Sequence, residues 1–486
     1  MGNDRQTVVI GSGITGLACA SKLRQMGVSV EVLEASERAG GVITAERRNG
    51  FLFDGGPQCP RFPHALWDLV LELGLEKEFV HVSARAKRFV WKRGELHPAP
   101  LSPWGLIKSR LVGAGCKARF IAEPFGNSHP PQEEESLAEF IRRKFGDEAV
   151  DYLIDPFAQS VFFAAPDDIG MESTMPAVAR WERETGSVFR GGIKARRKYK
   201  KPAAEIERSA TENQPAPHVP VTDFLPPLGS FKGGFAALTE KLAESLGGAL
   251  RFGAGVESLC AGGAGSSSRW KIRLSDGGEM RADSVVIAAP AHEAAKLLEY
   301  AAPHLSSLVG EIPYSPLAVV STGYDRKQVR HPLDGFGFNV PRCEGLHTIS
   351  CTWVSSLFPE RAPEGKVLIT TFARPVADEN FLDRGPEEIA RAVEGEGAAI
   401  LGISGDAVDR AVWKHERALP QYRVGHVQRV VAIRDAAREV AGLEIAGNYL
   451  DGRSVGESVD VALSAAEAVS REASGESLHA TGVGRS

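Results

Sequence analysis

The first 40 residues alternate between apolar segments with two different periods. Residues Thr7 to Ile10 form a short β-branched apolar run, which predicts a buried strand. Residues Leu17 to Met26 carry apolar side chains at helical spacing, and the glycines between Gly11 and Gly16 predict a tight turn before them. A second apolar run, VSVEVLEA at residues 28–35, predicts another strand. The N-terminal pattern is therefore a strand, a turn, a helix and a strand.

The middle of the chain changes to helical periodicity. The stretch LAEFIRRKFGDEAVDYLIDPFAQSVFF, residues 137–163, predicts a mainly helical insert over residues 101–221. Two stretches rich in proline and polar residues, 122–136 and 200–220, predict flexible loops or linkers.

The second half returns to strands. The segments WKIRL and SVVIA flank Asp276, Gly277 and Gly278 and predict a β-hairpin, and residues 314–372 predict a second, mixed sheet. Near the C-terminus, a strand, a glycine turn and a long helix from Val455 repeat the N-terminal pattern. We therefore predict an α/β fold. Its parts are a discontinuous Rossmann-like dinucleotide-binding domain (1–80, 222–298 and 426–475), a mixed α+β substrate domain (81–100 and 299–425), the insert (101–221) and a flexible tail (476–486).

The first turn has the chemistry of a phosphate site. At the spacing of Gly11, Gly13 and Gly16, the first glycine turns the chain, the second lets a pyrophosphate approach, and the third lets helix and strand pack closely. Free N–H groups at the helix start favour an anion there. Glu34 follows the second strand, where a carboxylate accepts hydrogen bonds from ribose hydroxyls and argues against NADP. Nicotinamide and flavin dinucleotides share this unit, so it does not separate them.

Further glycines follow, with Gly40 and Gly41 after Arg38, and Gly55 and Gly56 before Pro57. Closely spaced glycines outside the first turn suggest backbone lying against a large, flat ligand. This pattern resembles the flavin-containing amine oxidase superfamily, and the resemblance implies FAD and a fold of the two-dinucleotide-binding-domain flavoprotein type. The residues that it assigns to FAD are Gly11, Ser12, Gly13, Ile14, Thr15, Gly16, Glu34, Ala35, Arg38, Gly40, Gly41, Val42, Gly56, Pro57, Gln58, Val256, Asn448, Arg453, Ser454 and Val455.

Five segments in order resemble oxygen-dependent protoporphyrinogen oxidases. They are KRFVWKRGELHPAP (87–100), GSVFRGGIKARR (186–197), GFGFNVP (335–341), SSLFPERAP (355–363) and ALPQYRVGH (418–426). The substrate of that family is a mostly apolar tetrapyrrole with carboxylates, which needs a wide apolar cleft with a cation at one edge. By this resemblance Arg88 binds a propionate, Phe336 packs on the tetrapyrrole, and Asn339 stands where leucine is usual.

The reaction that the resemblance implies is the penultimate step of haem biosynthesis. Protoporphyrinogen IX loses three pairs of electrons to become protoporphyrin IX, each by hydride transfer from a meso carbon to the flavin, and dioxygen reoxidises the flavin to give hydrogen peroxide. The resemblance calls for no catalytic side chain and no metal ion, because the cofactor carries the chemistry.

The chain departs from this family at residues 159–166, QSVFFAAP, where bulkier residues replace a glycine-rich stretch. Together with Asn339, this keeps coproporphyrinogen III as an alternative substrate. A non-covalent FAD amine oxidase is another alternative, because the lack of a cysteine after Cys351 disfavours only the covalent type. A non-catalytic flavin-binding protein is a third.

Composition narrows the partners. The formal charge of −5 and the pI near 6.2 give no overall attraction to nucleic acid. The six cysteines contain no C-x-x-C pair, so we expect reduced, mostly buried thiols and no zinc site. With no secretory signal and no apolar run long enough to span a bilayer, a cytoplasmic location is expected. The basic run at residues 194–201 leaves peripheral contact with anionic lipid open. A homodimer and, by the resemblance, handover of product to ferrochelatase are also left open.

Overall fold

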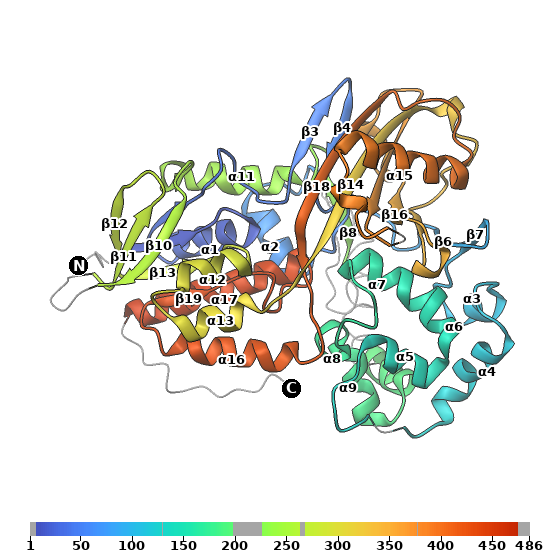
Figure 1. Cartoon of the computed structure of the whole chain (residues 1–486), viewed down its shortest axis with the longest axis horizontal. Coiled ribbons are helices and arrows are strands. Elements are labelled where there is room, and N and C mark those ends of the chain that lie inside the picture. Colours follow the sequence, from blue (N-terminus) through green and yellow to red (C-terminus); the bar gives the residue numbers. More distant parts are fainter. Residues whose placement is uncertain (1–5, 129, 198–225, 263–267, 377, 475–486) are drawn as a thin grey trace, which may run out of the picture.

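Three lobes make up the chain in the computed structural model (Figure 1), which describes residues 6–128, 130–197, 226–262, 268–376 and 378–474. One lobe is built on a parallel sheet and contains both the first strand and the last helix. A second is built on a large mixed sheet, and a third is the helical segment between them in sequence. The expected linker 200–220, the tail 476–486 and the last four residues of the basic run lie outside the described residues.

The parallel sheet combines strands from three distant parts of the chain, in the order β19-β13-β1-β2-β9. Its members are β1 (Gln6–Ile10), β2 (Ser29–Leu33), β9 (Leu250–Arg251), β13 (Ser284–Ile287) and β19 (Leu443–Ile445). The apolar run around Val9 predicted the first strand correctly, and its side chains alternate between the two faces of the sheet. The predicted discontinuous Rossmann-like α/β fold is thus confirmed.

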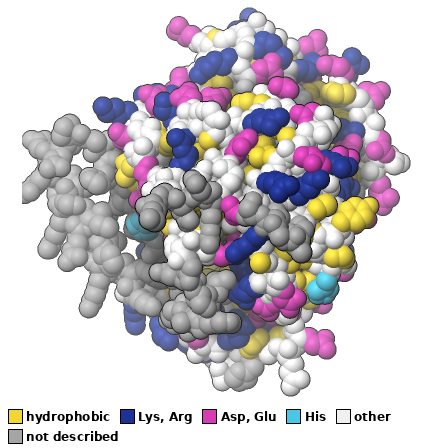
Figure 2. All heavy atoms as spheres, turned by 90° about the vertical axis from the view of Figure 1, so that its left-hand side faces the viewer, with side chains coloured by type: hydrophobic (Ala, Val, Ile, Leu, Met, Phe, Trp, Pro, Cys, Tyr) yellow, Lys and Arg dark blue, Asp and Glu magenta, His cyan; other side chains and the backbone are white. Residues whose placement is uncertain are grey.

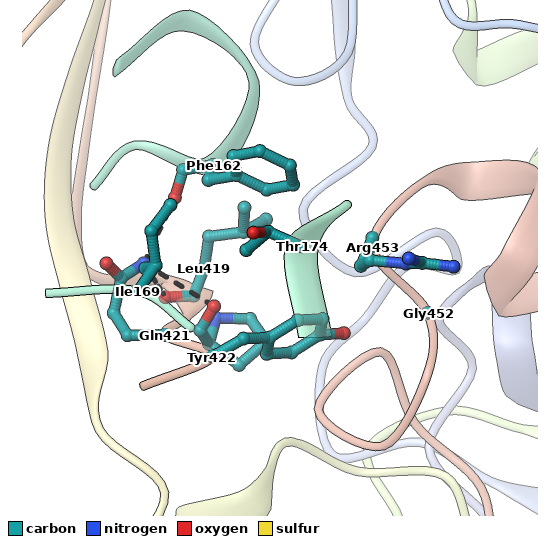
Figure 3. A pocket seen from close by; sticks show the side chains of 9 residues that line it. Phe162, Ile169, Thr174, Leu419, Gln421, Tyr422, Gly452 and Arg453 are labelled. Carbon is teal, nitrogen blue, oxygen red and sulfur yellow. Dashed lines mark hydrogen bonds between the residues drawn. The ribbon is translucent and has the colours of Figure 1, made fainter. Parts of the chain in front are cut away.

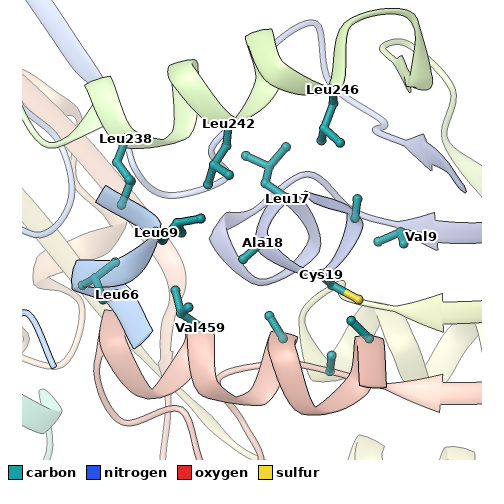
Figure 4. Close-up of a cluster of buried hydrophobic side chains, with 14 of the residues drawn as sticks. Val9, Leu17, Ala18, Cys19, Leu66, Leu69, Leu238, Leu242, Leu246 and Val459 are labelled. Carbon is teal, nitrogen blue, oxygen red and sulfur yellow. The ribbon is translucent and has the colours of Figure 1, made fainter. Parts of the chain in front are cut away.

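Four helices cover one face of this sheet and close a core around Leu17 and Val459 (Figure 4). They are α1 (Ile14–Gln25), α2 (His64–Glu72), α11 (Ala236–Leu246) and α17 (Val455–Ser474). On the other face lies a three-stranded sheet with three helices: β10 (Val256–Ala261), β11 (Trp270–Leu274), β12 (Glu279–Ala282), α12 (Ala291–Leu298), α13 (Pro303–Gly310) and α16 (His426–Arg438). The parallel strands are therefore buried on both sides, as such sheets require.

The mixed sheet has seven strands, in the order β18-β14-β17-β16-β15-β6-β7, with β15 and β6 parallel. Its members are β6 (Arg88–Lys92), β7 (Glu95–Pro98), β14 (Tyr314–Asp325), β15 (Gly337–Asn339), β16 (Thr348–Thr352), β17 (Lys366–Ala373) and β18 (Asp409–Pro420). Helix α15 (Pro386–Leu401) packs on one face, where Ile389 and Val393 meet Val320. The other face turns toward the lobe of the parallel sheet, since a Cβ at Gly55 would lie 2.7 Å from the Trp413 ring of β18. The expected mixed sheet over residues 314–372 is confirmed.

The insert is helical in its described part, as its periodicity predicted. Its elements are α3 (Pro103–Lys108), α4 (Ala114–Ala122), α5 (Leu137–Phe145), α6 (Asp147–Ala149), a π-helical turn (Val150–Ile154), α7 (Asp155–Phe162), α8 (Met171–Thr174), α9 (Pro176–Thr185) and helical residues 188–197. Helix α7 lies against β15 and β16. Among the described residues no helix combines the length and apolar character needed to cross a bilayer.

Two short strand pairs complete the molecule. Strand β3 (Ala45–Arg48) pairs with β4 (Phe51–Asp54), and β5 (Phe79–Val82) pairs with β8 (Leu228–Phe231). On the side of the molecule that faces the viewer in Figure 2, basic and acidic side chains are mixed over the described part, and no broad area of one charge forms.

The predicted hairpin is wrong in one arm. Strand β11 pairs with Glu279–Ala282, whereas SVVIA forms the separate parallel strand β13. All four residues of that strand are buried, and a continuous apolar run suits a central parallel strand better than a half-exposed hairpin arm. The turn prediction also ended too late, because α1 already begins at Ile14.

Two further expectations are corrected. The stretch 122–136 begins with the buried residue Glu123, whose carboxylate accepts hydrogen bonds from Ser187 Oγ and from the backbone N–H of Val188, each at 2.7 Å. Its first residues are therefore anchored, contrary to a flexible linker. The cysteines are also less uniformly buried than expected, because Cys260 and Cys343 are exposed.

Candidate cofactor and substrate site

The carboxyl ends of the parallel strands bring the first cofactor residues together. Gly11 follows β1, Glu34 follows β2 and Asn448 lies three residues after β19. A Cβ at Gly11, whose φ is +101°, would lie 3.1 Å from the carbonyl oxygen of Ala288, just after β13. In open parallel sheets, ligands bind at this edge where the strand order reverses. Here the order reverses around β1.

The glycine turn leaves space where a phosphate group would lie. A Cβ at Gly16 would come within 1.9 Å of the Gly11 carbonyl oxygen, so this glycine is fixed by packing. A Cβ at Gly13 would meet nothing within 4 Å. Gly13 is also the N-cap of α1, and no side chain caps that helix start. The uncapped helix start beside open space suits an anionic group.

The second glycine pair lies beside the first turn. Gly40 donates its N–H to the carbonyl oxygen of Ser12 at 2.8 Å, and Gly13 and Gly40 form a parallel bridge. A Cβ at Gly41 would be 3.4 Å from the Gly13 Cα. The next residue, Val42, is 52 % exposed, although it is apolar. An exposed valine beside the exposed Gly41 fits a surface that a ligand covers.

Glu34 is held by two serines. Its carboxylate accepts hydrogen bonds from the backbone N–H and the hydroxyl of Ser12, at 2.8 and 2.7 Å, and from the same groups of Ser36, at 2.9 and 2.8 Å. Burial by itself raises the pKa of Glu34, but these four hydrogen bonds outweigh it and lower the pKa below its ordinary value. The carboxylate is therefore ionised and oriented, as a ribose contact requires.

The predicted adenine contact lies next to this carboxylate. Ala254 donates its N–H to the Glu34 carbonyl oxygen at 2.8 Å, and a Cβ at Gly255 would lie 3.5 Å from the Ala35 Cβ. Val256 follows directly as the first residue of β10. Nearby, the Arg38 guanidinium donates to the Gly41 carbonyl oxygen at 2.6 Å and so fixes the second glycine loop.

The C-terminal segment packs on the stretch that follows the third glycine pair. The start of α17 packs on the segment after Gln58, since a Cβ at Gly456 would lie 2.3 Å from Pro63. A Cβ at Gly56 would lie 2.6 Å from the Val42 carbonyl oxygen. The side chain of Gln58 is buried and donates to the Asp54 carbonyl oxygen at 2.9 Å, while its own Oε1 has no partner among the described residues. That orphaned oxygen is available to a ligand N–H group.

Two predicted cofactor side chains in this segment are engaged elsewhere. Arg453 forms an ion pair with Glu457 and reaches the Ser173 carbonyl oxygen in the insert. The Ser454 hydroxyl accepts the N–H of Glu457 at 3.3 Å and so caps α17, which starts at Val455. At these positions the backbone, and not the side chain, is free to meet a cofactor. The Asn448 carbonyl oxygen accepts a hydrogen bond from the Tyr422 hydroxyl.

The predicted substrate residues lie on and beside one face of the mixed sheet. Arg88 pairs with Gly337, and Asn339 pairs with Val90 two positions along, so Arg88 and Asn339 point to the same side. The guanidinium of Arg88 lies over the Phe336 ring, with its Cζ 4.5 Å from the ring centroid. The structure thus brings Arg88 and Phe336 into contact, while Asn339 lies nearer α7 and donates to Ser160 Oγ at 3.3 Å.

Aromatic residues that sequence reasoning missed line the same face. Phe372 and Trp413 share a buried cluster with Phe163, and the Phe163 and Phe372 rings stack at 5.6 Å. A Cβ at Gly55 would lie 2.7 Å from the Trp413 ring, so this face meets the third glycine pair directly. Residues 159–166, where the sequence departs from the family, therefore form part of the wall of this site. Phe163 there has a left-handed backbone, with φ of +48°, which is unusual for an aromatic residue.

A small pocket lies between the insert and the C-terminal loop (Figure 3). Its cavity volume is about 10 Å³, and its lining includes Phe162, Gln421, Tyr422 and Arg453. Gln421 closes one wall by donating to the Phe162 carbonyl oxygen at 3.1 Å. A cavity of this size has room for about one water molecule, so it cannot hold a macrocycle.

No cluster of three or more potential metal ligands occurs in the described part of the chain. The site is thus made of glycine turns, helix starts, one oriented carboxylate and an aromatic sheet face with an arginine at its edge. Its residues fit a dinucleotide with a flat ring system at one end.

Comparison with known proteins agrees with this geometry. The flavin containing amine oxidoreductase family matches residues 14–470. Over 96 % of its length the chain is 30 % identical to mitochondrial protoporphyrinogen oxidase of Nicotiana tabacum, covering 94 % of that protein. It is also 27 % identical to coproporphyrinogen III oxidase of Bacillus subtilis, with 94 % of this chain and 96 % of that protein covered.

A solved structure described as a putative protoporphyrinogen oxidase from Exiguobacterium sp. 255-15 has the same fold. It superposes with a TM-score of 0.79 at 23 % identity, covering 96 % of this chain and 99 % of the other. Both resemblances seen in the sequence, to the superfamily and to protoporphyrinogen oxidases within it, are confirmed. The chain therefore belongs to the flavin-containing amine oxidoreductase family and is an oxidoreductase whose cofactor is FAD.

Proposed function

We propose that this protein oxidises a porphyrinogen to a porphyrin, with protoporphyrinogen IX as the first substrate to test and dioxygen as the electron acceptor that yields hydrogen peroxide. The observation that carries this proposal is the contact between Arg88 and Phe336 beside the face that meets Gly55. A half-buried guanidinium stacked on an aromatic ring suits a flat ligand with a carboxylate edge.

In this proposal the chain binds and orients, and the flavin supplies the acceptor for each hydride. The glycine turns, Glu34 and the start of α17 hold FAD. Trp413 and Phe372 give the substrate an apolar surface, and Arg88 fixes its carboxylate edge. The predicted domain boundaries are part of the same proposal, in which residues 1–80 and 426–475 hold FAD and residues 81–100 and 299–425 hold the substrate.

Coproporphyrinogen III is the second candidate. Asn339 places an amide on the substrate face, and Phe163 narrows the wall near Phe372. Both features alter the part of the site away from Arg88, where a substrate with more carboxylates would differ from protoporphyrinogen. The match to a coproporphyrinogen III oxidase supports testing it alongside.

Anaerobic mixing tests the proposal directly. The FAD-loaded protein is mixed with protoporphyrinogen IX, coproporphyrinogen III and a panel of small amines, and flavin absorbance is followed. Bleaching by one porphyrinogen, followed by peroxide formation when air is admitted, is expected. Bleaching by an amine alone would contradict the proposal, and no bleaching by any compound would favour a flavin-binding protein without this activity.

We also propose peripheral contact with a lipid surface through the start of the insert. Trp104 is 73 % exposed and Phe125 is 86 % exposed, and Lys108, Lys117 and Arg119 are close in sequence. Exposed aromatic and basic side chains together suit the interface of an anionic bilayer. The double variant Trp104→Ser/Phe125→Ser is expected to co-sediment less with phosphatidylserine vesicles than the unaltered protein. Equal co-sedimentation of the two would contradict the assignment.

A further inference from the structure

Three arginines lie around one apolar cluster, which contains Phe336, Phe358 and Leu228, and one of the three is neutralised. Arg361 is fully buried, and its guanidinium forms an ion pair with Asp54 at 2.5 Å. It also donates to Ser230 Oγ at 2.7 Å and to the Phe231 carbonyl oxygen at 3.0 Å. The Asp54 carboxylate therefore neutralises the charge of Arg361 within the protein.

The other two arginines, Arg61 and Arg88, have no such counter-charge. Arg61 donates to the Pro226 carbonyl oxygen at 2.9 Å, and Arg88 donates to two loop carbonyl oxygens at 3.2 and 3.3 Å. The ring of Phe336 is the remaining contact of Arg88. Within residues that the structure describes, no carboxylate forms an ion pair with either guanidinium.

Both guanidinium groups are placed by rigid backbone. The backbone on either side of Arg61 is tied to the strand that starts at Leu228, since Phe62 donates to Pro227 and Gly229 donates to Pro60 at 2.9 and 3.2 Å. Arg88 is the first residue of β6 and is paired on both sides, with β15 and with β7. Neither charge is on a freely moving loop.

Both arginines border the same apolar cluster, because Arg88 lies over the Phe336 ring and the backbone of Arg61 bridges to Leu228. Burial lowers the pKa of Arg88, and the neighbouring Arg61 lowers it further; burial also lowers the pKa of Arg61. Two partly desolvated cations side by side are unfavourable unless an anion lies between them. Guanidinium groups bind carboxylates with two parallel hydrogen bonds, and each of these groups has donors left after its carbonyl contacts.

We propose that Arg61 is a second carboxylate-binding residue and that Arg61 and Arg88 together bind two neighbouring carboxylates on one edge of the substrate. The inference rests on the proposed function and adds to it the substrate class, a macrocycle with at least two adjacent acid side chains. Because Arg61 lies only three residues after Gln58, it also holds that edge next to the cofactor segment.

The test compares a porphyrinogen diacid with its dimethyl ester, which has the same ring without the charges. Arg61→Gln removes the charge and keeps an amide donor for the Pro226 carbonyl oxygen. Its KM for the diacid is expected to rise about tenfold with little change in kcat, while the KM for the ester stays the same. Arg61→Lys should recover part of the diacid affinity.

Arg85→Gln is the matched control, because Arg85 is an exposed arginine three residues before Arg88. It should leave both KM values unchanged. FAD content and the melting temperature are measured for each variant, and Arg61→Met, which also removes the charge, replaces Arg61→Gln if the latter does not retain FAD.

The outcomes separate the inference from the proposed function. If the unaltered protein oxidises the diacid and Arg61→Gln does so with the same KM, or if diacid and ester are affected equally, the role of Arg61 is wrong. If the unaltered protein oxidises neither compound, the proposed function itself fails.

Discussion

Arg361 and Arg88 border the same apolar cluster, Arg361 over the Phe358 ring and Arg88 over the Phe336 ring, but their surroundings differ in one respect. Arg361 faces the Asp54 carboxylate and is fully enclosed, whereas Arg88 faces a ring and carbonyl oxygens at the edge of an open face. Arg361 holds strand β4 to the segment between β16 and β17. Arg88 has no counter-charge among the described residues. An arginine is therefore structural where the fold supplies its counter-charge, and it is available to bind an anionic ligand where the fold supplies none.

The largest expected effect breaks the structural arginine. Arg361→Met leaves the buried Asp54 carboxylate without its counter-charge, which should lower the free energy of unfolding by about 3–5 kcal/mol. Arg88→Met should lower it far less, since no carboxylate is stranded. Urea unfolding of both variants measures the difference, and an equal loss for both would remove the contrast.

The glycines of the first turn allow the same comparison. Gly16→Ala places a Cβ 1.9 Å from the Gly11 carbonyl oxygen, so this variant should fold poorly. Gly13→Ala has free space within the protein and should fold, but the added methyl group occupies the phosphate position, so FAD affinity should fall by about tenfold or more. Flavin content after dialysis, with far-UV circular dichroism as the folding control, distinguishes the two. Full flavin retention by Gly13→Ala would contradict the phosphate assignment.

Arg88 itself should affect turnover and spare the cofactor. Arg88→Ala is expected to raise the KM for the porphyrinogen by about tenfold through loss of a charged hydrogen bond, while FAD stays bound. Steady-state oxygen uptake measures the change, and the flavin spectrum is the control. Unchanged kinetics would remove Arg88 from the substrate site.

The smallest expected effect is the contribution of Glu34 to stability at low pH. The pKa of Glu34 lies below its ordinary value of 4.5, so its ionised form contributes to stability above that pH, and the contribution is lost as pH falls through the lowered value. Melting temperatures measured downward from pH 5 should therefore fall more steeply for the unaltered protein than for Glu34→Gln. Parallel curves for the two proteins would show that the serine hydrogen bonds contribute nothing to folding.

The sequence alone determined the features that depend on local backbone. The spacing of Gly11, Gly13 and Gly16 predicts a phosphate-binding turn, because only glycine permits the close approach of a phosphate and of the helix to the strand. The ribose role of Glu34 is predicted from its place after the second strand. The apolar period of each segment likewise predicted the first two strands of the parallel sheet, the helical insert and the C-terminal strand and helix. These signals are short-range, so one sequence suffices to see them.

Tertiary structure alone decided which distant residues share a site. SVVIA could form a hairpin arm or a central strand, and its pairing with β1 and β19 settled the choice through burial on both faces. Asp54 and Arg361 are 307 positions apart, and Arg61 reaches the neighbourhood of Arg88 only through the fold. Whether an arginine is neutralised depends on such long-range neighbours, because its counter-charge comes from another part of the chain.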